Sequence, residues 1–362
     1  IQITHPTLHK DIKKGHRIFL DDGRIEAEGL SVRGRKIFTK VVLAGVLLSN
    51  KGINLPDSSV SGSSFTKKDE EDLLFGLQQG VDWIALSFVS NAKTIERVRK
   101  LIKEKCRYLG TTPPRIISKI ERREALDRFE EIMGASDAIM LARGDLGVEI
   151  NPEQVPIVQK EVIELCRQSG KPVVVATHML DSMTKSPRAT RAETSDVANA
   201  VIDHADAVML SAESATGDYP DKTVQTMNTV IAEAENSRFD DIGFYQIHDI
   251  EDIETSIAQT LHVMSRNDQI DVIATSSTYG CVTEAINMFR PDAKIILACP
   301  NKTVARQMAM RSGVTPIVLS DAPGTFLHRM ESKMRKDRLV FSKQRVAYVT
   351  KAPHGVIQLT IK

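Results

Sequence analysis

The stretch R-I-I-S-K-I at residues 115–120, followed by A-I-M-L at 138–141, shows the pattern from which the fold is predicted. Five such apolar runs occupy residues 83–89, 115–120, 138–141, 173–176 and 207–210. Amphipathic helical patterns separate them, for example at residues 94–108, 155–168 and 195–204. Strands that are apolar on both faces and alternate with helices indicate a parallel sheet. This periodicity fits a doubly wound fold and a closed (β/α) barrel equally well.

The segment before these units predicts an inserted domain. Residues 1–60 carry short apolar runs between turns such as Arg33-Gly34, which is typical of a small β domain. The helical pattern at 67–79 then has no strand directly before it. We therefore expect its strand to lie upstream of Ile1, so that five complete units and one further helix belong to an α/β (β/α)8 TIM barrel that is N-terminally incomplete here.

A third part follows an acidic linker-like stretch at residues 236–252. Strand and helix patterns alternate again beyond it, which predicts a separate C-terminal α/β domain. The expected division is a small β lid domain at 1–62, a barrel at 63–238 and the C-terminal α/β domain at 239–362.

Composition excludes several functional classes. Lys and Arg number 48 against 47 Asp and Glu, and no long run of like charges occurs, so we expect no nucleic-acid partner and no membrane. No apolar stretch approaches the length of about 20 residues that crosses a bilayer. The 4 cysteines form no C-x-x-C pair, which favours a reducing, cytoplasmic location.

Lys119 and Glu121 are the first candidate functional residues. Side chains alternate along a strand, so both project from the same face of the strand at 115–120. A charged pair is costly inside a barrel unless it lies at the open mouth, where ligands bind. A solvated strand end or a simple ion pair is the alternative interpretation.

The segment R-G-D-L-G at residues 143–147 ends the next strand and reads as a loop. Its glycines allow backbone N–H groups to approach an anion, while Asp145 reaches a cation. Glu121 and Asp145 on adjacent strands, with Lys119 between them, form a suitable set for Mg²⁺ and a phosphate, which suggests phosphoryl transfer. Glycine–aspartate pairs also form ordinary turns.

The two following strands also end in polar residues, namely Thr177 and the pair Ser211 and Glu213. Each hydroxyl taken alone fits a helix N-cap equally well. Four successive strands with polar ends favour a functional rim. His178 has no second histidine at metal-ligand spacing. The charged segment at 186–193 is either a solvated loop or a subunit contact.

Longer motifs resemble those of the pyruvate kinase family. They are K-G-I-N-L-P at 51–56, S-K-I-E at 118–121, A-R-G-D-L-G-V-E-I at 142–150, K-P-V-V-V-A-T-H-M-L-D-S-M at 171–183, T-R-A-E-T-S-D-V-A-N-A-V at 190–201 and M-L-S-A-E-S-A-T-G-D-Y-P at 209–220. Their order and length cover nearly the whole chain, and the resemblance implies a barrel with a β lid and a C-terminal α/β domain.

The resemblance also implies an activity, the transfer of the phosphoryl group of phosphoenolpyruvate to ADP, giving pyruvate and ATP in glycolysis. Lys119 would stabilise the phosphoryl group, and Glu121 and Asp145 would ligate Mg²⁺ or Mn²⁺. Phosphoenolpyruvate would bind Gly144, Asp145 and Thr177. Further implied roles are nucleotide phosphate binding by Lys51 and ordering of a proton-delivering water by Ser211 and Glu213.

Some implied features lie beyond these residues. The K⁺ ligands of the family belong to a segment expected upstream of Ile1, and the assembly would be a homotetramer. The loop Thr275 to Gly280 resembles the family's effector loop, although a helix N-cap explains it as well. Departures from the family pattern are His178, Ala189, Ala212, Ser214 and Thr216.

Two other functions remain open at this point. One is a non-catalytic relative of pyruvate kinase that needs a partner chain. The other is a different metal-dependent barrel enzyme acting on phosphoenolpyruvate or pyruvate, such as an aldolase or lyase.

Overall fold

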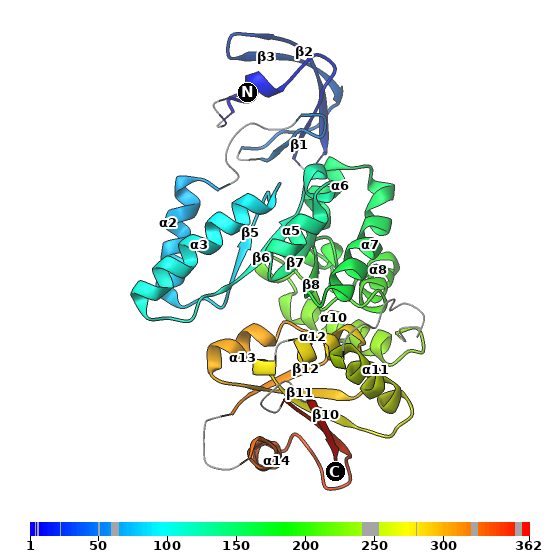
Figure 1. The fold of residues 1–362 in the computed structure, drawn as a ribbon. Coiled ribbons are helices and arrows are strands. Elements are labelled where there is room, and N and C mark those ends of the chain that lie inside the picture. Colours follow the sequence, from blue (N-terminus) through cyan, green and yellow to red (C-terminus); the bar gives the residue numbers. More distant parts are fainter. Residues whose placement is uncertain are drawn as a thin grey trace.

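The computed structural model describes residues 1–3, 5, 7–21, 23–49, 51–58, 65–240, 253–279, 281–319, 325–351 and 357–362, and these residues form three β-sheets. Figure 1 shows the sheets one after another along the chain, the N-terminus with the first and the C-terminus with the last. Across these ranges, none of the helices has both the length and the apolar composition that a bilayer crossing requires.

The first sheet is antiparallel and has the strand order β3-β2-β1-β4. Its elements are α1 (Leu8–Asp11), β1 (Arg17–Leu20), β2 (Ile25–Arg33), β3 (Lys36–Leu43) and β4 (Ile53–Asn54). Gly34 turns the chain between β2 and β3 with a φ of 58°, a conformation that glycine adopts without strain. Ile12, Ile18 and Leu55 are among the residues of its small core. The predicted small β unit is thus confirmed.

The second sheet is parallel, in the sequential order β5-β6-β7-β8-β9. Its strands are β5 (Trp83–Leu86), β6 (Arg115–Ile120), β7 (Ala138–Ala142), β8 (Val173–Ala176) and β9 (Ala207–Met209). These are the five (β/α) units expected of the barrel. Within the described residues the sheet is open, because β5 and β9 each pair on one side only.

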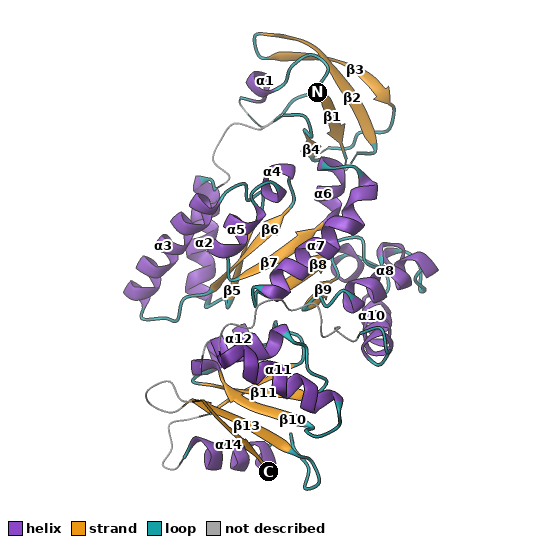
Figure 2. Cartoon of the chain, turned by 45° about the vertical axis from the view of Figure 1, so that its right-hand side comes forward, coloured by secondary structure: helices purple, strands orange, loops and turns teal. Residues whose placement is uncertain are grey.

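Helices cover one face of this sheet (Figure 2). The helices of this part of the chain are α2 (Lys67–Gln79), α3 (Ala92–Leu109), α4 (Arg123–Leu126), α5 (Phe129–Ala135), α6 (Arg143–Glu149), α7 (Val155–Gln168), α8 (Arg191–Ile202), α9 (Ala212–Ala215) and α10 (Pro220–Glu235), with short 3-10 turns η1 (Pro152–Gln154) and η2 (Asp181–Thr184). Ile116 and Ile120 of β6 pack into the large core beneath them. Ile117 of the same strand packs on the opposite face with Met140 and Val174, so both faces are apolar as a parallel sheet requires.

The helix boundaries follow from local capping. At the start of α2, Thr66 Oγ1 accepts from Asp69 N at 3.2 Å and Asp69 Oδ2 accepts from Thr66 N at 2.7 Å. The same capping box, made by Thr190 and Glu193, begins α8 at Arg191. The sequence prediction began this helix at residue 195 and was wrong, because the last three residues of the charged segment at 186–193 form the capped first turn.

Two further predictions are corrected. The run 83–89 does not continue as a strand, because β5 ends at Leu86 and Phe88 has a φ of 55°, outside the extended region. The segment 143–147 is not a loop but most of α6. Glycine is a poor helix former, and tertiary contacts determine the outcome here.

The third sheet has the order β12-β11-β10-β13-β14, and only the pair β13–β14 is antiparallel. Its elements are α11 (Ile253–Arg266), β10 (Val272–Ser276), η4 (Ser277–Tyr279), α12 (Cys281–Met288), β11 (Lys294–Cys299), α13 (Lys302–Met308), β12 (Val314–Val318), α14 (Phe326–Lys336), β13 (Val346–Lys351) and β14 (Ile357–Ile361). Most of the expected linker, residues 241–252, lies outside the described residues.

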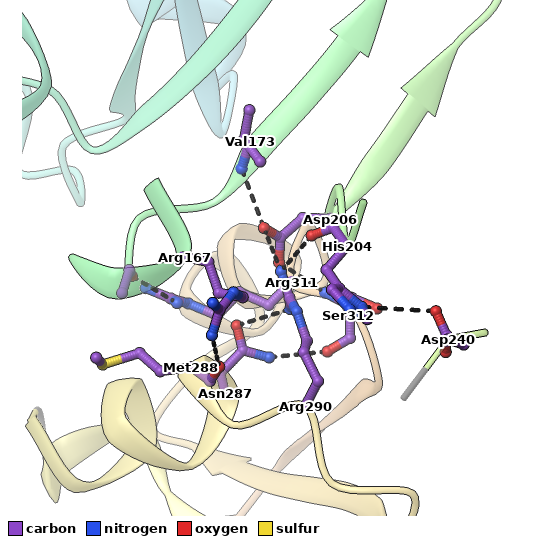
Figure 3. Close-up of polar contacts among 11 residues, drawn as sticks. Arg167, Val173, His204, Asp206, Asp240, Asn287, Met288, Arg290, Arg311 and Ser312 are labelled. Carbon is purple, nitrogen blue, oxygen red and sulfur yellow. Dashed lines mark hydrogen bonds and ion pairs between the residues drawn. The ribbon is translucent and has the colours of Figure 1, made fainter. Parts of the chain in front are cut away.

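The parallel sheet and the C-terminal sheet meet at Asp206, which directly precedes β9 (Figure 3). Its carboxylate accepts from Val173 N at the start of β8 and from Ser312 N of the C-terminal part, both at 3.0 Å. Arg290 forms an ion pair with the same carboxylate. One buried carboxylate therefore joins two strands to the C-terminal part.

A second contact lies at the beginning of β5. Arg306 Nε donates to Asp82 Oδ2 at 2.6 Å, and Gln307 Nε2 donates to the Pro113 carbonyl at 3.0 Å. Trp83 follows Asp82, and the Arg115 guanidinium lies 5.8 Å from the centre of its ring.

Candidate active site

Polar residues follow four consecutive parallel strands, β6 to β9, and therefore lie along one edge of the sheet. The register pairs Ile120 with Leu141 and Ala142 with Ala176, so the carboxyl ends of β6, β7 and β8 are level. Ala176 pairs in turn with Met209 of β9. The predicted shared rim is confirmed, and the carboxyl ends of barrel strands are where such folds bind ligands.

Lys119 and Glu121 come together at the end of β6. The Lys119 ammonium forms an ion pair with Glu121 Oε1, and Lys119 Nζ also donates to Ser87 Oγ at 2.9 Å. Glu121 Oε2 accepts a hydrogen bond from Phe88 N at 2.7 Å, and Glu121 is only 1% exposed. The buried carboxylate is thus compensated by a cation and a backbone donor, as its burial requires.

Ser87 and Phe88 were missed by the sequence prediction. They stand just past the end of β5, and the left-handed φ of Phe88 brings its N–H to Glu121. A serine followed by a bulky residue within an apolar run also fits a continuing strand. The local sequence therefore did not indicate their role.

Gly144 and Thr177 connect the ends of β7 and β8. Thr177 Oγ1 accepts from Gly144 N and donates to the Ala176 carbonyl, both at 2.6 Å. A Cβ at position 144 would lie 3.2 Å from Thr177 Oγ1 and 3.3 Å from His178 Cε1, so any larger residue here would push these side chains by a few tenths of an ångström. Asp145 lies beside Gly144 in the first turn of α6, where the helix dipole favours a negative charge.

Glu213 is buried and connects the loops after β8 and β9. Its Oε1 accepts from Leu180 N at 3.2 Å and its Oε2 accepts from Ser211 N at 2.8 Å. Both carboxylate oxygens are thus bonded to the backbone. Glu213 therefore fixes the position of Ser211 at the rim.

Lys51 lies in the antiparallel sheet region and not with the rim residues. Its Nζ forms an ion pair with Asp21 Oδ1 at 2.8 Å. The same region contacts α6 through β4, and Asn54 and Glu149 line one cavity. Burial raises the pKa of Glu149, and the positive charge of Arg122 opposes this rise.

A cavity of about 780 Å³ is lined by residues of this region, of α2 and of β5. Its walls include Asn54 and Glu149 on one side and Ser87 and Phe88 on the other. The cavity therefore reaches the two residues that hold Lys119 and Glu121.

Family models match most of the chain. The model "Pyruvate kinase, barrel domain" matches residues 1–224, and "Pyruvate kinase, alpha/beta domain" matches residues 255–360. The chain belongs to the pyruvate kinase family. The family resemblance inferred from the motifs is thereby confirmed.

Individual pyruvate kinases agree with this assignment. A pyruvate kinase of Staphylococcus saprophyticus is 41% identical over 322 residues, which are 87% of this chain and 54% of that protein. One of Agrobacterium vitis is 41% identical over 327 residues, 88% of this chain and 66% of that protein. The crystal structure of a pyruvate kinase from Cryptosporidium parvum superposes with a TM-score of 0.88 at 32% identity, covering 99% of this chain and 75% of that one.

The chain spans between about half and two thirds of the length of these two curated pyruvate kinases. The barrel, lid and C-terminal α/β architecture expected from the sequence agrees with the matched family models and the solved structure.

Glu121 and Asp145 are the residues of this chain that would bind a metal ion. Among the described residues, no group of three or more His, Cys, Asp or Glu side chains is arranged to hold a metal ion. Mg²⁺ is commonly bound by one or two carboxylates, with substrate phosphates and water completing its shell. The donor chemistry of these two carboxylates fits that pattern.

The loop resembling the pyruvate kinase effector loop is partly described. Thr275 is fully buried, and Ser276 Oγ lies 2.9 Å from Thr278 Oγ1 and accepts from Thr278 N at 3.3 Å. The Ser276 and Thr278 hydroxyls therefore bond to each other, whereas Thr275 Oγ1 is buried without a hydrogen-bond partner among the described residues. Gly280, the last residue of the predicted loop, lies outside the described residues.

Proposed function

We propose that this chain catalyses transfer of the phosphoryl group from phosphoenolpyruvate to ADP, giving pyruvate and ATP. The observation that carries the proposal is the Lys119–Glu121 pair at the strand rim, with Gly144 and Thr177 hydrogen-bonded on the neighbouring strands. Membership of the pyruvate kinase family supports the same reaction.

The reaction requires that the two substrates be positioned and that positive charge lie close to the phosphoryl group. Phosphoryl transfer passes through a loose transition state whose charge is spread over the phosphoryl oxygens. Lys119, fixed by Ser87 and Glu121, presents its ammonium to those oxygens and stabilises the charge. Mg²⁺ held by Glu121 and Asp145 would supply further positive charge against the phosphate oxygens.

The remaining rim residues bind the substrate and direct the proton. We assign phosphoenolpyruvate binding to the backbone of Gly144 and Asp145 together with the Thr177 hydroxyl. A water ordered by Ser211 protonates the enolate. Glu213 holds Ser211 in place by accepting a hydrogen bond from the Ser211 backbone N–H. Lys51 contacts the nucleotide phosphates, which requires it to leave Asp21 when the nucleotide binds.

Several wider features are proposed with this activity. They are Mn²⁺ as a substitute for Mg²⁺, activation by K⁺, a homotetramer, a cytoplasmic location and a phosphorylated effector near Thr275. We also propose the domain division at 1–62, 63–238 and 239–362. The family assignment supports the ions, the assembly, the location and the effector, and the three separate sheets support the domain division.

A coupled assay for pyruvate formation from phosphoenolpyruvate and ADP tests the function. We expect turnover that requires Mg²⁺ and rises with K⁺, and a loss of at least about 100-fold in Lys119→Met. Lys185→Met is the matched control, because that lysine is exposed and forms an ion pair with Asp218 on the surface. Absence of pyruvate formation by the folded chain, or full activity of Lys119→Met, would contradict the proposal.

A further inference from the structure

The turn after β8 has an unusual backbone. Thr177 and His178 have φ angles of 70° and 55°, and neither is glycine. A left-handed conformation is especially unfavourable for a β-branched residue, and each such residue costs about 1–3 kcal/mol. Such a turn persists only where neighbouring groups determine its conformation.

Arg143, the first residue of α6, contacts this turn directly. Its Nη2 donates to the Thr177 carbonyl at 3.1 Å and lies 2.8 Å from Met179 Sδ. The next residue, Gly144, donates its N–H to the Thr177 hydroxyl. The carbonyl and the side chain of Thr177 are therefore both bound by the start of α6.

The other side of the guanidinium is bound by two helices. Arg143 Nη1 donates to Asp196 Oδ1 of α8 at 2.7 Å and to Gln159 Oε1 of α7 at 3.1 Å. The arginine side chain is only 9% exposed, and its Nε has no hydrogen-bond partner among the described residues. Burying a charge with one unsatisfied donor lowers stability. The hydrogen bonds of Arg143 to the turn offset part of this cost.

We propose that Arg143, oriented by Asp196, is a positioning residue that keeps the Thr177–His178 turn in its strained conformation and thereby aims the Thr177 hydroxyl at phosphoenolpyruvate. This inference rests on the proposed function for the role of Thr177. Arg143 acts through Thr177. A planar guanidinium binds the carbonyl, the carboxylate and the amide at once, which the single ammonium of lysine cannot reproduce.

Steady-state kinetics of Arg143→Lys and Arg143→Met give the first test. We expect kcat/KM for phosphoenolpyruvate to fall by about 10–100-fold, with KM for ADP unchanged. Arg167→Met is the matched control, because that buried arginine donates to the Met288 carbonyl far from the rim. If kcat/KM fell as much in Arg167→Met as in Arg143→Met, general destabilisation would explain both losses, and the proposal would be overturned.

A double-mutant cycle separates positioning from structural support. In Thr177→Val the hydroxyl is already absent, so adding Arg143→Met to this background is expected to cost less than about twofold. Asp196→Asn, which keeps the shape of the pair, is expected to show a smaller loss of the same kind. Full additivity of the Arg143 and Thr177 changes would overturn the proposal.

A structural measurement decides the inference independently of turnover. A crystal structure of Arg143→Met is expected to show Thr177 and His178 at negative φ. If the unmodified chain forms no pyruvate, the proposed function fails, yet this readout still tests the positioning role. Retention of both positive φ angles in the variant would overturn it.

Discussion

Asp206 accepts one hydrogen bond from each Nη atom of Arg290, both at 2.9 Å, and this pair joins the parallel sheet to the C-terminal part (Figure 3). The Asp206 side chain is 1% exposed and that of Arg290 is 10% exposed. Removing one partner of a buried pair leaves an uncompensated charge, and this costs far more than a surface pair does.

Asp206→Asn is therefore expected to lower the free energy of unfolding by about 3–5 kcal/mol. Urea denaturation followed by circular dichroism measures this change. Asp292→Asn, at an exposed position in the same part of the chain, serves as the control and is expected to shift the midpoint very little. Equal midpoints for Asp206→Asn and the unmodified chain would show that the pair contributes nothing.

Ser87→Ala is expected to lower kcat by about 10–100-fold, because Lys119 loses a charge-assisted hydrogen bond that fixes its ammonium. Ser87→Thr retains the hydroxyl and is expected to restore most of the activity. The control is Ser118→Ala, since that buried serine bonds to Ser136 on the other face of β6. Equal losses for Ser87→Ala and Ser118→Ala would contradict a specific role for Ser87.

Gly144→Ala is expected to reduce kcat/KM for phosphoenolpyruvate by about tenfold, because the new Cβ displaces Thr177 and His178 by a few tenths of an ångström. Gly134→Ala is the matched control in α5, where a Cβ would meet nothing within 4 Å. That control is expected to keep full activity and equal or higher stability. Unchanged kinetics of Gly144→Ala would show that the contact is not needed.

Glu121→Gln tests the metal assignment without relying on turnover. Losing a charged oxygen ligand is expected to weaken Mn²⁺ binding by more than about tenfold, as measured by electron paramagnetic resonance titration. Glu130→Gln, an exposed residue of α5, is the control and is expected to bind like the unmodified chain. Equal affinities in both variants would place the metal elsewhere.

His204 makes stability depend on pH. Burial, with help from the charges of Arg290 and Arg167, lowers its pKa from 6.5 to about 4, although Asp240 lies 3.5 Å away and favours the protonated ring. Between these values the unfolded chain binds a proton that the folded chain does not, so stability falls as the pH drops.

The loss for His204 is on the order of 3 kcal/mol across this window. His204→Asn is expected to show a smaller difference between urea midpoints at pH 7 and pH 4.5 than the unmodified chain. Parallel pH profiles of the two proteins would exclude this contribution.

The regular parts of the fold could be predicted from sequence. β6 and α7 begin and end where their periodicities indicated, because each buries an apolar face that repeats with the geometry of its element. The shared rim of Lys119 and Thr177 followed from the same reasoning, since parallel strands place their carboxyl ends together. The role of α6 was hidden by its two glycines, which favour a loop when propensity is considered alone.

Contacts between distant residues carry no comparable signal in one sequence. Lys119 and its partner Ser87 stand 32 residues apart, and Asp206 and Arg290 stand 84 apart. The strained φ of Thr177 is equally hidden, because nothing about a threonine after an apolar run indicates a left-handed backbone.

Trp83 is the only tryptophan in the chain, and it stands next to the Asp82 carboxylate that Arg306 binds. Its indole emission consequently reports on β5 and on the contact between this strand and the C-terminal part. A red shift during denaturation would mark the exposure of this end of β5 to water. The chain thus contains its own optical probe for this end of the parallel sheet, without any added label.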